Sequence, residues 1–189
     1  PVVELVNNRE REYIFADLPD IGYSTDIDTV MASSYQVKKQ LQQIVRIEQP
    51  ITNTLLYKRI LRIWNLTRVT TRLQVFIDSL LEDAYKDPLS GDTIIYWENK
   101  EKAKDCDFYR INSKRDILDI PILEVMSAAR YAIEQQISMP IEDLKRLTSQ
   151  LLGFSRKGNN LDMVTEQTIQ LLIDQGIFSH ANGMVSMSN

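Results

Sequence analysis

The sequence predicts a mainly α-helical α+β fold with small β-hairpins, in which one structural unit occurs twice. Two observations support this prediction. Residues 64–68 read Trp-Asn-Leu-Thr-Arg, and residues 152–156, which lie 88 positions later, read Leu-Gly-Phe-Ser-Arg. In both copies an amphipathic helical pattern precedes and follows this turn, and the register still holds at Leu73 and Leu161. A repeat at a fixed offset is typical of a duplicated unit.

The composition is that of a globular protein with one medium or two small domains, because the chain has 189 residues and is 43% hydrophobic. Its apolar runs are far shorter than the roughly 20 residues needed to cross a bilayer. The single cysteine, Cys106, excludes an internal disulfide and fits a reducing compartment. We therefore expect a cytoplasmic protein that does not contact a membrane. Position 1 is Pro rather than Met, so we expect a piece of a longer protein.

The charge is unevenly distributed along the chain. The net charge of −4 argues against a uniformly basic nucleic-acid binder. Residues 37–73, however, carry eight Lys or Arg and one acid, whereas residues 1–36 carry two Arg and seven acids. The acidic segment either covers the basic one as a pseudo-substrate does, or is a solvated linker, which is the more common role of a charged run.

Residues 1–34 are predicted to be an extended arm. Polar and apolar residues alternate over residues 13–18, which favours a strand or an extended segment, and Pro19 ends it. From Ser34 the pattern changes to the helical spacing of apolar residues and continues to Pro50. The same apolar positions recur 88 residues later, before Pro140.

A second helix is predicted from about Thr52 to Trp64, with Thr52 or Asn53 as its N-cap. Its apolar stripe faces inward, and three cations, Lys58, Arg59 and Arg62, lie on the opposite face. The second copy has only Lys145 and Arg146 at this level, together with two acids in the first turn.

The third helix of each copy follows the turn and is followed by strands. Leu73 begins a long helical pattern in the first copy, and Gly176 closes the corresponding helix in the second. The Asn182-Gly183 dipeptide favours a tight hairpin turn in the second copy. In the first copy, residues 93–97 are expected to pair with residues 108–111. Three helices and a β-hairpin describe a winged helix, so we predict an arm at 1–34 and winged-helix-like repeats at 35–120 and 121–189.

Four segments resemble the domain-of-unknown-function family 3320. They are residues 13–18 (YIFADL), 47–51 (IEQPI), 64–68 (WNLTR) and 151–158 (LLGFSRKG). This family occurs at the C-terminal end of large bacterial superfamily I helicase-like proteins, usually after an endonuclease-like domain. The resemblance therefore implies a non-catalytic accessory role in DNA processing or defence, and it supplies no ligand. Asn65 and Thr70 stand where the second copy has Gly153 and Gly158, which leaves open whether the two turns share one geometry.

The sequence offers no constellation for catalysis or for a cofactor. A phosphate-binding Gly-rich motif is absent, so ATP hydrolysis is not expected in this chain. One histidine, His180, and one cysteine are too few for a Cys/His zinc site. We expect no cofactor, no metal and no small-molecule substrate, and we place any ATP-dependent helicase or nuclease activity in the parent protein.

The predicted nucleic-acid-binding residues are the cations of the turns and of the second and third helices. They are Lys58, Arg59, Arg62, Arg68, Arg72, Arg156 and Lys157. The third helix of a winged helix enters the major groove, which brings Arg68 and Arg72 to DNA, while the other cations of the first copy contact phosphates. The other interpretation is that these cations only keep a helix face soluble or pair with the acidic arm. For Arg156 and Lys157, which stand among acids, this second interpretation is favoured.

The functional prediction is an accessory module that binds DNA weakly through the first copy and that positions the helicase and nuclease domains of its parent chain. The alternative is a protein-interaction or regulatory module that docks on those domains without contacting DNA. A third hypothesis, a free-standing enzyme, is supported by no set of catalytic residues in the sequence.

Overall fold

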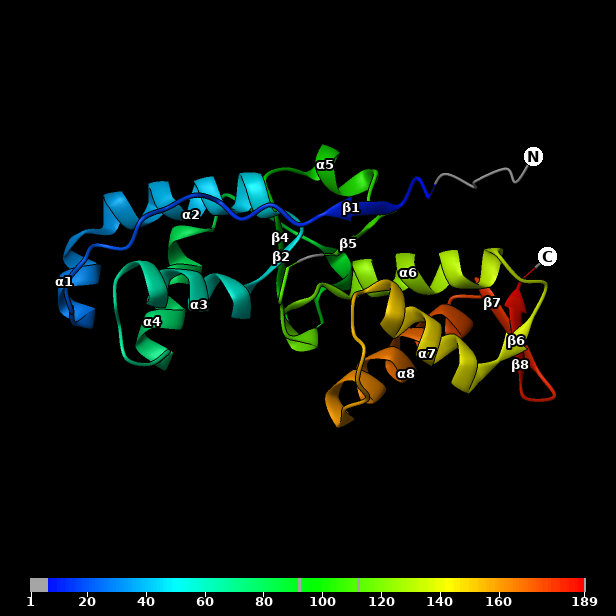
Figure 1. Ribbon diagram of the computed structural model, residues 1–189. Helices are drawn as coiled ribbons and strands as arrows, with labels where there is room; N and C mark the ends of the chain where they lie inside the picture. The colour runs from blue at the N-terminus through cyan, green and yellow to red at the C-terminus, as the bar shows by residue number, and fades with distance from the viewer. Residues whose placement is uncertain (1–6, 92, 112, 189) are drawn as a thin grey trace, which may run out of the picture. The chain divides into compact units, whose positions relative to one another are not determined.

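The computed structural model describes residues 7–91, 93–111 and 113–188, which fold into two compact units (Figure 1). The first unit is Ile14–Asp105, and the second comprises Pro1–Tyr13 and Cys106–Asn189. The described residues form eight α-helices and small sheets, so the prediction of a mixed fold rich in helix is confirmed. None of these helices is long and apolar enough to cross a membrane.

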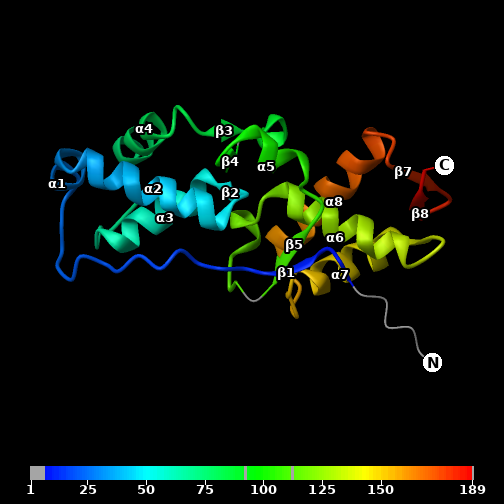
Figure 2. The ribbon, with the colours of Figure 1, turned by 90° about the horizontal axis from the view of Figure 1, so that it is seen from above.

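The described part of the first unit contains five α-helices, of which α2, α3 and α4 pack on one another, and a three-stranded antiparallel sheet (Figures 1 and 2). Its elements are α1 (Ile27–Ala32), α2 (Ser34–Glu48), β2 (Ile51–Thr52), α3 (Asn53–Ile63), α4 (Thr71–Leu80), β3 (Tyr85–Lys86), a 3-10 turn (Pro88–Ser90), β4 (Ile95–Trp97) and α5 (Lys100–Lys104). The strand order is β2-β4-β3, with Ile51 opposite Tyr96 and Tyr85 opposite Trp97. The middle strand, β4, is therefore the last of the three in sequence order.

The helices of the first unit begin and pack as the apolar spacing predicts. Along α2, Val37 and Leu41 are fully buried, and α3 buries Leu56 and Ile60. A threonine caps each of α3 and α4: the Thr52 hydroxyl accepts from the Leu55 amide of α3 at 3.3 Å, and that of Thr70 accepts from the Leu73 amide of α4 at 3.2 Å. Such caps satisfy amides that have no partner within the helix.

The second unit repeats this order of elements after a two-stranded parallel pair. Its elements are β1 (Glu10–Glu12), β5 (Tyr109–Ile111), a 3-10 turn (Ile117–Asp119), α6 (Ile122–Glu134), β6 (Met139–Pro140), α7 (Ile141–Leu151), α8 (Asn159–Asp174), β7 (Phe178–Ala181) and β8 (Met184–Met187). The antiparallel sheet has the order β6-β8-β7, so the last strand again lies in the middle. Strand β1 pairs with β5, outside that sheet.

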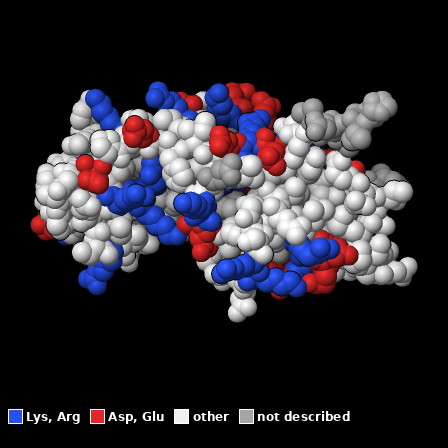
Figure 3. All heavy atoms as spheres, in the orientation of Figure 1, with Lys and Arg blue, Asp and Glu red and all other residues white. Residues whose placement is uncertain are grey.

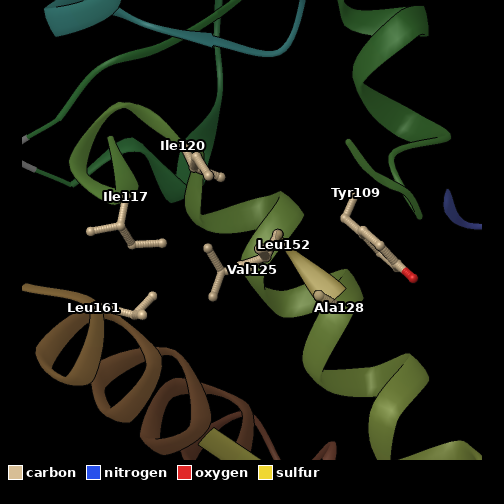
Figure 4. Close-up of a cluster of buried hydrophobic side chains, with 7 residues drawn as sticks. All are labelled: Tyr109, Ile117, Ile120, Val125, Ala128, Leu152 and Leu161. Carbon is tan, nitrogen blue, oxygen red and sulfur yellow. The ribbon is translucent and has the colours of Figure 1, made fainter. Parts of the chain in front are cut away.

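A cluster of apolar side chains forms part of the core of the second unit (Figure 4). Its buried members are Tyr109, Ile117, Ile120, Val125, Ala128, Leu152 and Leu161. They come from β5, from the segment before α6, from α6 itself, from the end of α7 and from α8. Residues 106–120 therefore supply core side chains to the second unit.

The compact units divide the chain at 13–14 and at 105–106, rather than at the predicted boundaries 34–35 and 120–121. The second boundary lies before residue 120 because Ile117 and Ile120 both pack in the core of the second unit. The predicted arm is also split. Tyr13 donates its amide to the carbonyl of Ile111 at 3.0 Å in the second unit, whereas residues 14–34 belong to the first.

One predicted hairpin is confirmed and the other is wrong. Strands β7 and β8 pair around Asn182 and Gly183, whose φ angles of 53° and 75° are those of a tight turn. In the first copy, β4 pairs with β2 and β3, and residues 109–111 pair with β1 of the second unit. The two-residue strand β3 is too short to show an alternating pattern, which explains the error.

The turn after the second helix has the same geometry in both units. Asn65 and Gly153 both adopt a positive φ, of 47° and 89°. The Leu66 amide donates to the carbonyl of Leu61 at 2.9 Å, and the corresponding pair 88 positions later, Phe154 and Ser149, forms the same bond at 2.9 Å. The replacement of Gly by Asn in the first copy therefore does not change the geometry of the turn.

Candidate nucleic-acid interface

Helix α3 presents cations on the face opposite its buried stripe. Lys58 and Arg62 are exposed, whereas Ile60 and Ile63 point into the core. Figure 3 shows Lys and Arg side chains gathered over this helix. The placement follows from the helical period, because residues four positions apart lie on the same face.

Arg59 differs from its two neighbours because it points toward the interior. Its guanidinium lies 3.0 Å from the carboxylate of Glu48 and donates to the carbonyl of Ala16 at 2.6 Å. The side chain of Arg59 is 12% exposed and that of Glu48 is fully buried. The ring of Phe15 lies 5.4 Å from the same guanidinium. Arg59 is therefore largely withdrawn from any ligand of the outer face.

The turn and the start of α4 carry the next two cations. Arg68 is exposed in the turn, and Arg72 is exposed in the first turn of α4. Arg72 forms an ion pair with Asp28 of α1 at 2.7 Å. On the outward side of α4, Val75 is 64% exposed. It lies three residues after Arg72 and therefore on the same helix face, a position that the helical period alone indicates.

The exposed cations of α3 and the turn differ in their partners. Among residues 7–91, 93–111 and 113–188, no acidic side chain lies within 4 Å of Arg62 or Arg68. Lys58 makes a further contact of its own. Two guanidinium groups are therefore exposed without an acidic partner, one in the last turn of α3 and one in the turn that precedes α4.

The corresponding surface of the second unit has a different charge. Arg156 and Lys157 are exposed in the turn and line a groove of about 520 Å³ along α7 and α8. Helix α8 itself carries three acids, Asp162, Glu166 and Asp174, and no Lys or Arg. These acids weaken the attraction of Arg156 and Lys157 for a phosphate, although Lys145 of α7 pairs with two of them.

Lys145 is the buried cation of this second surface. Its ammonium lies 2.7 Å from Asp162, 3.4 Å from Glu142 and 3.6 Å from Glu166, and its side chain is 8% exposed. The hydrogen bond to Asp162 is the largest of the effects that raise the pKa of Lys145 above its ordinary value. Lys145 is thus neutralised within the unit.

The described residues contain no group of three or more His, Cys, Asp or Glu side chains arranged to hold a metal ion. His180 is exposed on β7, and Cys106 is half-buried. Neither side chain belongs to the basic surface.

The chain is thus a mixed protein of α-helices and small sheets in two compact units, and its first unit has a basic surface on α3, on the turn and at the start of α4. The family described as "Protein of unknown function (DUF3320)" matches residues 32–75. This segment contains α2, α3, the turn and the first half of α4, and thus every predicted site residue of the first unit. The resemblance is therefore confirmed for residues 32–75. No curated protein and no solved structure matches the chain.

Proposed function

We propose that both units are winged helices and that the first binds DNA through a surface formed by Lys58, Arg62, Arg68 and Arg72. The order of elements supports the fold assignment, because each unit runs helix, strand, helix, helix, strand, strand with the last strand in the middle of its sheet. In such a fold the third helix, here α4, lies in the major groove.

The observation that carries the proposal is the exposure of Arg62 and Arg68 without an acidic partner in the described chain. Guanidinium groups of this kind bind phosphate oxygens with fork geometry. Contacts to phosphates give an affinity that depends on salt and only weakly on sequence. We therefore expect weak binding to duplex and single-stranded DNA.

The cellular role that we propose is that of a non-catalytic accessory module. The match to residues 32–75 supports the resemblance to family 3320, and the helicase and nuclease context that this resemblance implies is part of the proposal. The proposed partners are DNA and the helicase and nuclease domains of a longer parent chain, in a bacterial cytoplasm. Catalysis belongs to those domains in this proposal.

Fluorescence anisotropy with a labelled duplex at low salt tests the DNA proposal. Arg62→Glu combined with Arg68→Glu should weaken binding at least about tenfold, and the slope of log affinity against log salt should fall by about two, since each lost phosphate contact removes about 0.9. The matched control is Lys100→Glu with Lys102→Glu, which reverses two exposed cations on α5 of the same unit. Equal binding by the two double variants would show that the surface of α3 and α4 is not the site.

A second candidate function, docking on protein, is favoured for the second unit by the acids of α8. Asp162, Glu166 and Asp174 lie on one helix that has no cation, and Met163 beside them is 44% exposed. The proposed partner surface is a basic face of the adjacent catalytic domain. Glu166→Lys with Asp174→Lys should weaken binding to that domain, supplied separately, and should leave duplex binding by the first unit within about twofold. Undiminished binding to the domain would exclude α8 as the docking surface.

A further inference from the structure

An extended segment of the first unit runs along α3 (Figures 1 and 2). We call residues 14–28, which end in the first turn of α1, the strap. Ala16 joins the strap to both members of the buried ion pair: its amide donates to Glu48 at 3.0 Å, and its carbonyl accepts from Arg59 at 2.6 Å. Further along, the amide of Ile21 donates to the carbonyl of Ile63 at 2.9 Å. The strap thus follows α3 toward its C-terminal end.

The strap continues across the turn to α4. The hydroxyl of Thr25 donates to the carbonyl of Trp64, at the end of α3. Asp28 then forms its ion pair with Arg72, the cation in the first turn of α4. Both side chains are more than half exposed, so water screens this pair and it contributes little to stability. One chain segment therefore lies along α3 and the turn through backbone carbonyls and the buried ion pair, and it reaches the basic surface itself at Arg72.

The strap buries fewer apolar side chains than helices α2 and α3 do. Ile14, Phe15 and Tyr23 are 66%, 45% and 64% exposed. Ala16 is buried, and Leu18, Ile21 and Ile27 are half-buried. A segment with little buried apolar area and a few backbone hydrogen bonds opens at a lower free energy than the core does.

We propose that the end of the strap masks Arg72, one of the four cations of the DNA-binding surface, and that DNA displaces it there. The carboxylate of Asp28 occupies the guanidinium of Arg72 as a phosphate does, because both anions accept the same forked donors. Bound strap and bound DNA are therefore mutually exclusive at Arg72. The inference rests on the proposed function, because it names the regulation of the same surface.

The proposal is tested with the Asp28→Asn variant, whose binding to a labelled duplex is measured by fluorescence anisotropy at low salt. The substitution frees Arg72 and removes one negative charge, so we expect the affinity to rise about fivefold. The control is Asp17→Asn, which removes the same charge from an exposed position of the strap outside the contacts to Arg59 and Arg72. We expect the control to raise the affinity at most about twofold. An equal rise in duplex affinity in the two variants would overturn the proposal, because the loss of one negative charge would then explain both.

Hydrogen exchange provides a second measurement that does not require DNA. The amides of Ala16 and Ile21 should exchange at least about tenfold faster than those of Leu56 and Ile60 in α3, through an opening that leaves the helices folded. Addition of duplex should speed exchange at Ile21 further. Exchange of Ile21 only with global unfolding would overturn the proposal, because the strap would then be an integral part of the core.

The two proposals fail in different ways. Binding that is lost in the Arg62 and Arg68 double variant but is the same for Asp28→Asn and Asp17→Asn supports the DNA surface and overturns the strap. Absence of duplex binding by the wild type and by Asp28→Asn overturns both, because an unmasked surface that binds no DNA has no ligand to regulate.

Discussion

The guanidinium of Arg59 lies 3.0 Å from the fully buried carboxylate of Glu48, although the sequence places Arg59 in a row of cations with Lys58 and Arg62. The pair connects α2 with α3, and the strap completes it through Ala16. Two arginines of one helix, three positions apart, thus have different roles. Arg59 stabilises the first unit, whereas Arg62 remains available to a ligand.

Arg59→Met should lower the free energy of unfolding of the first unit by about 3 kcal/mol, because it leaves the buried carboxylate of Glu48 without its cation. The double variant with Glu48→Gln should recover a large part of this loss, since a neutral side chain replaces the unpaired charge. Arg62→Met, at the exposed position, should change stability by less than about 0.5 kcal/mol. Urea unfolding measures all three; equal losses at positions 59 and 62 would contradict the assignment.

A second buried cluster predicts how the second unit responds to acid. Glu124 is fully buried and accepts from Arg110 at 2.5 Å and from Arg115 at 2.8 Å. Burial by itself would raise the pKa of Glu124, but the two guanidinium groups outweigh it and hold the pKa below its ordinary value. The folded pKa is thus lower than the unfolded one, so the stabilisation is present above the unfolded pKa and is lost as the pH falls through the folded pKa.

Glu124→Gln should therefore cost about 3 kcal/mol at neutral pH. It should also flatten the decline of stability in acid, because the titrating group is gone. Urea unfolding of wild type and variant over a series of acidic pH values measures both effects. A variant whose stability falls as steeply as that of the wild type would show that Glu124 is not responsible for the acid response.

Three buried tyrosines predict a loss of stability in alkali. Burial raises the pKa of Tyr109 to about 12, and it raises the pKa values of Tyr57 and Tyr96 as well, with the carboxylate of Asp78 adding to the effect. The folded pKa lies above the unfolded value of about 10, so the contribution is complete below pH 10 and is lost as the pH rises through the folded pKa. Asp78→Asn should lower the pKa values of Tyr57 and Tyr96 and leave that of Tyr109 unchanged. Tyrosinate absorbance during a titration measures this difference.

The helices could be predicted from the sequence because their inner faces are defined by spacing alone. Val37, Leu41 and Ile44 recur at helical positions, and all three are fully buried. The pairing of β1 with β5 could not be predicted. Glu10, Arg11 and Glu12 are charged and exposed, so no alternation marks this strand, and its partner lies about a hundred residues away.

The candidate site could be predicted only in part, for a similar reason. The helical period places Lys58 and Arg62 outward, and both are exposed. Arg59 lies at the edge of that face, and its direction is decided by Glu48 on another helix, which no local pattern indicates. The charge contrast between residues 1–36 and 37–73 suggested that acids of the arm pair with the cations, and Asp28 with Arg72 is such a pair.

The shared turn geometry of Asn65 and Gly153 predicts an unequal response to alanine and glycine. Both residues have a positive φ, and a Cβ atom at Gly153 would have no neighbour within 4 Å, so Gly153→Ala costs only backbone strain, about 1 kcal/mol. Asn65→Ala should cost a similar amount. Asn65→Gly should change the free energy of unfolding by less than about 0.5 kcal/mol, because relief of strain offsets the greater freedom of glycine in the unfolded chain. Urea unfolding of the three variants tests the pattern; a neutral Gly153→Ala would show that this turn does not require its left-handed residue.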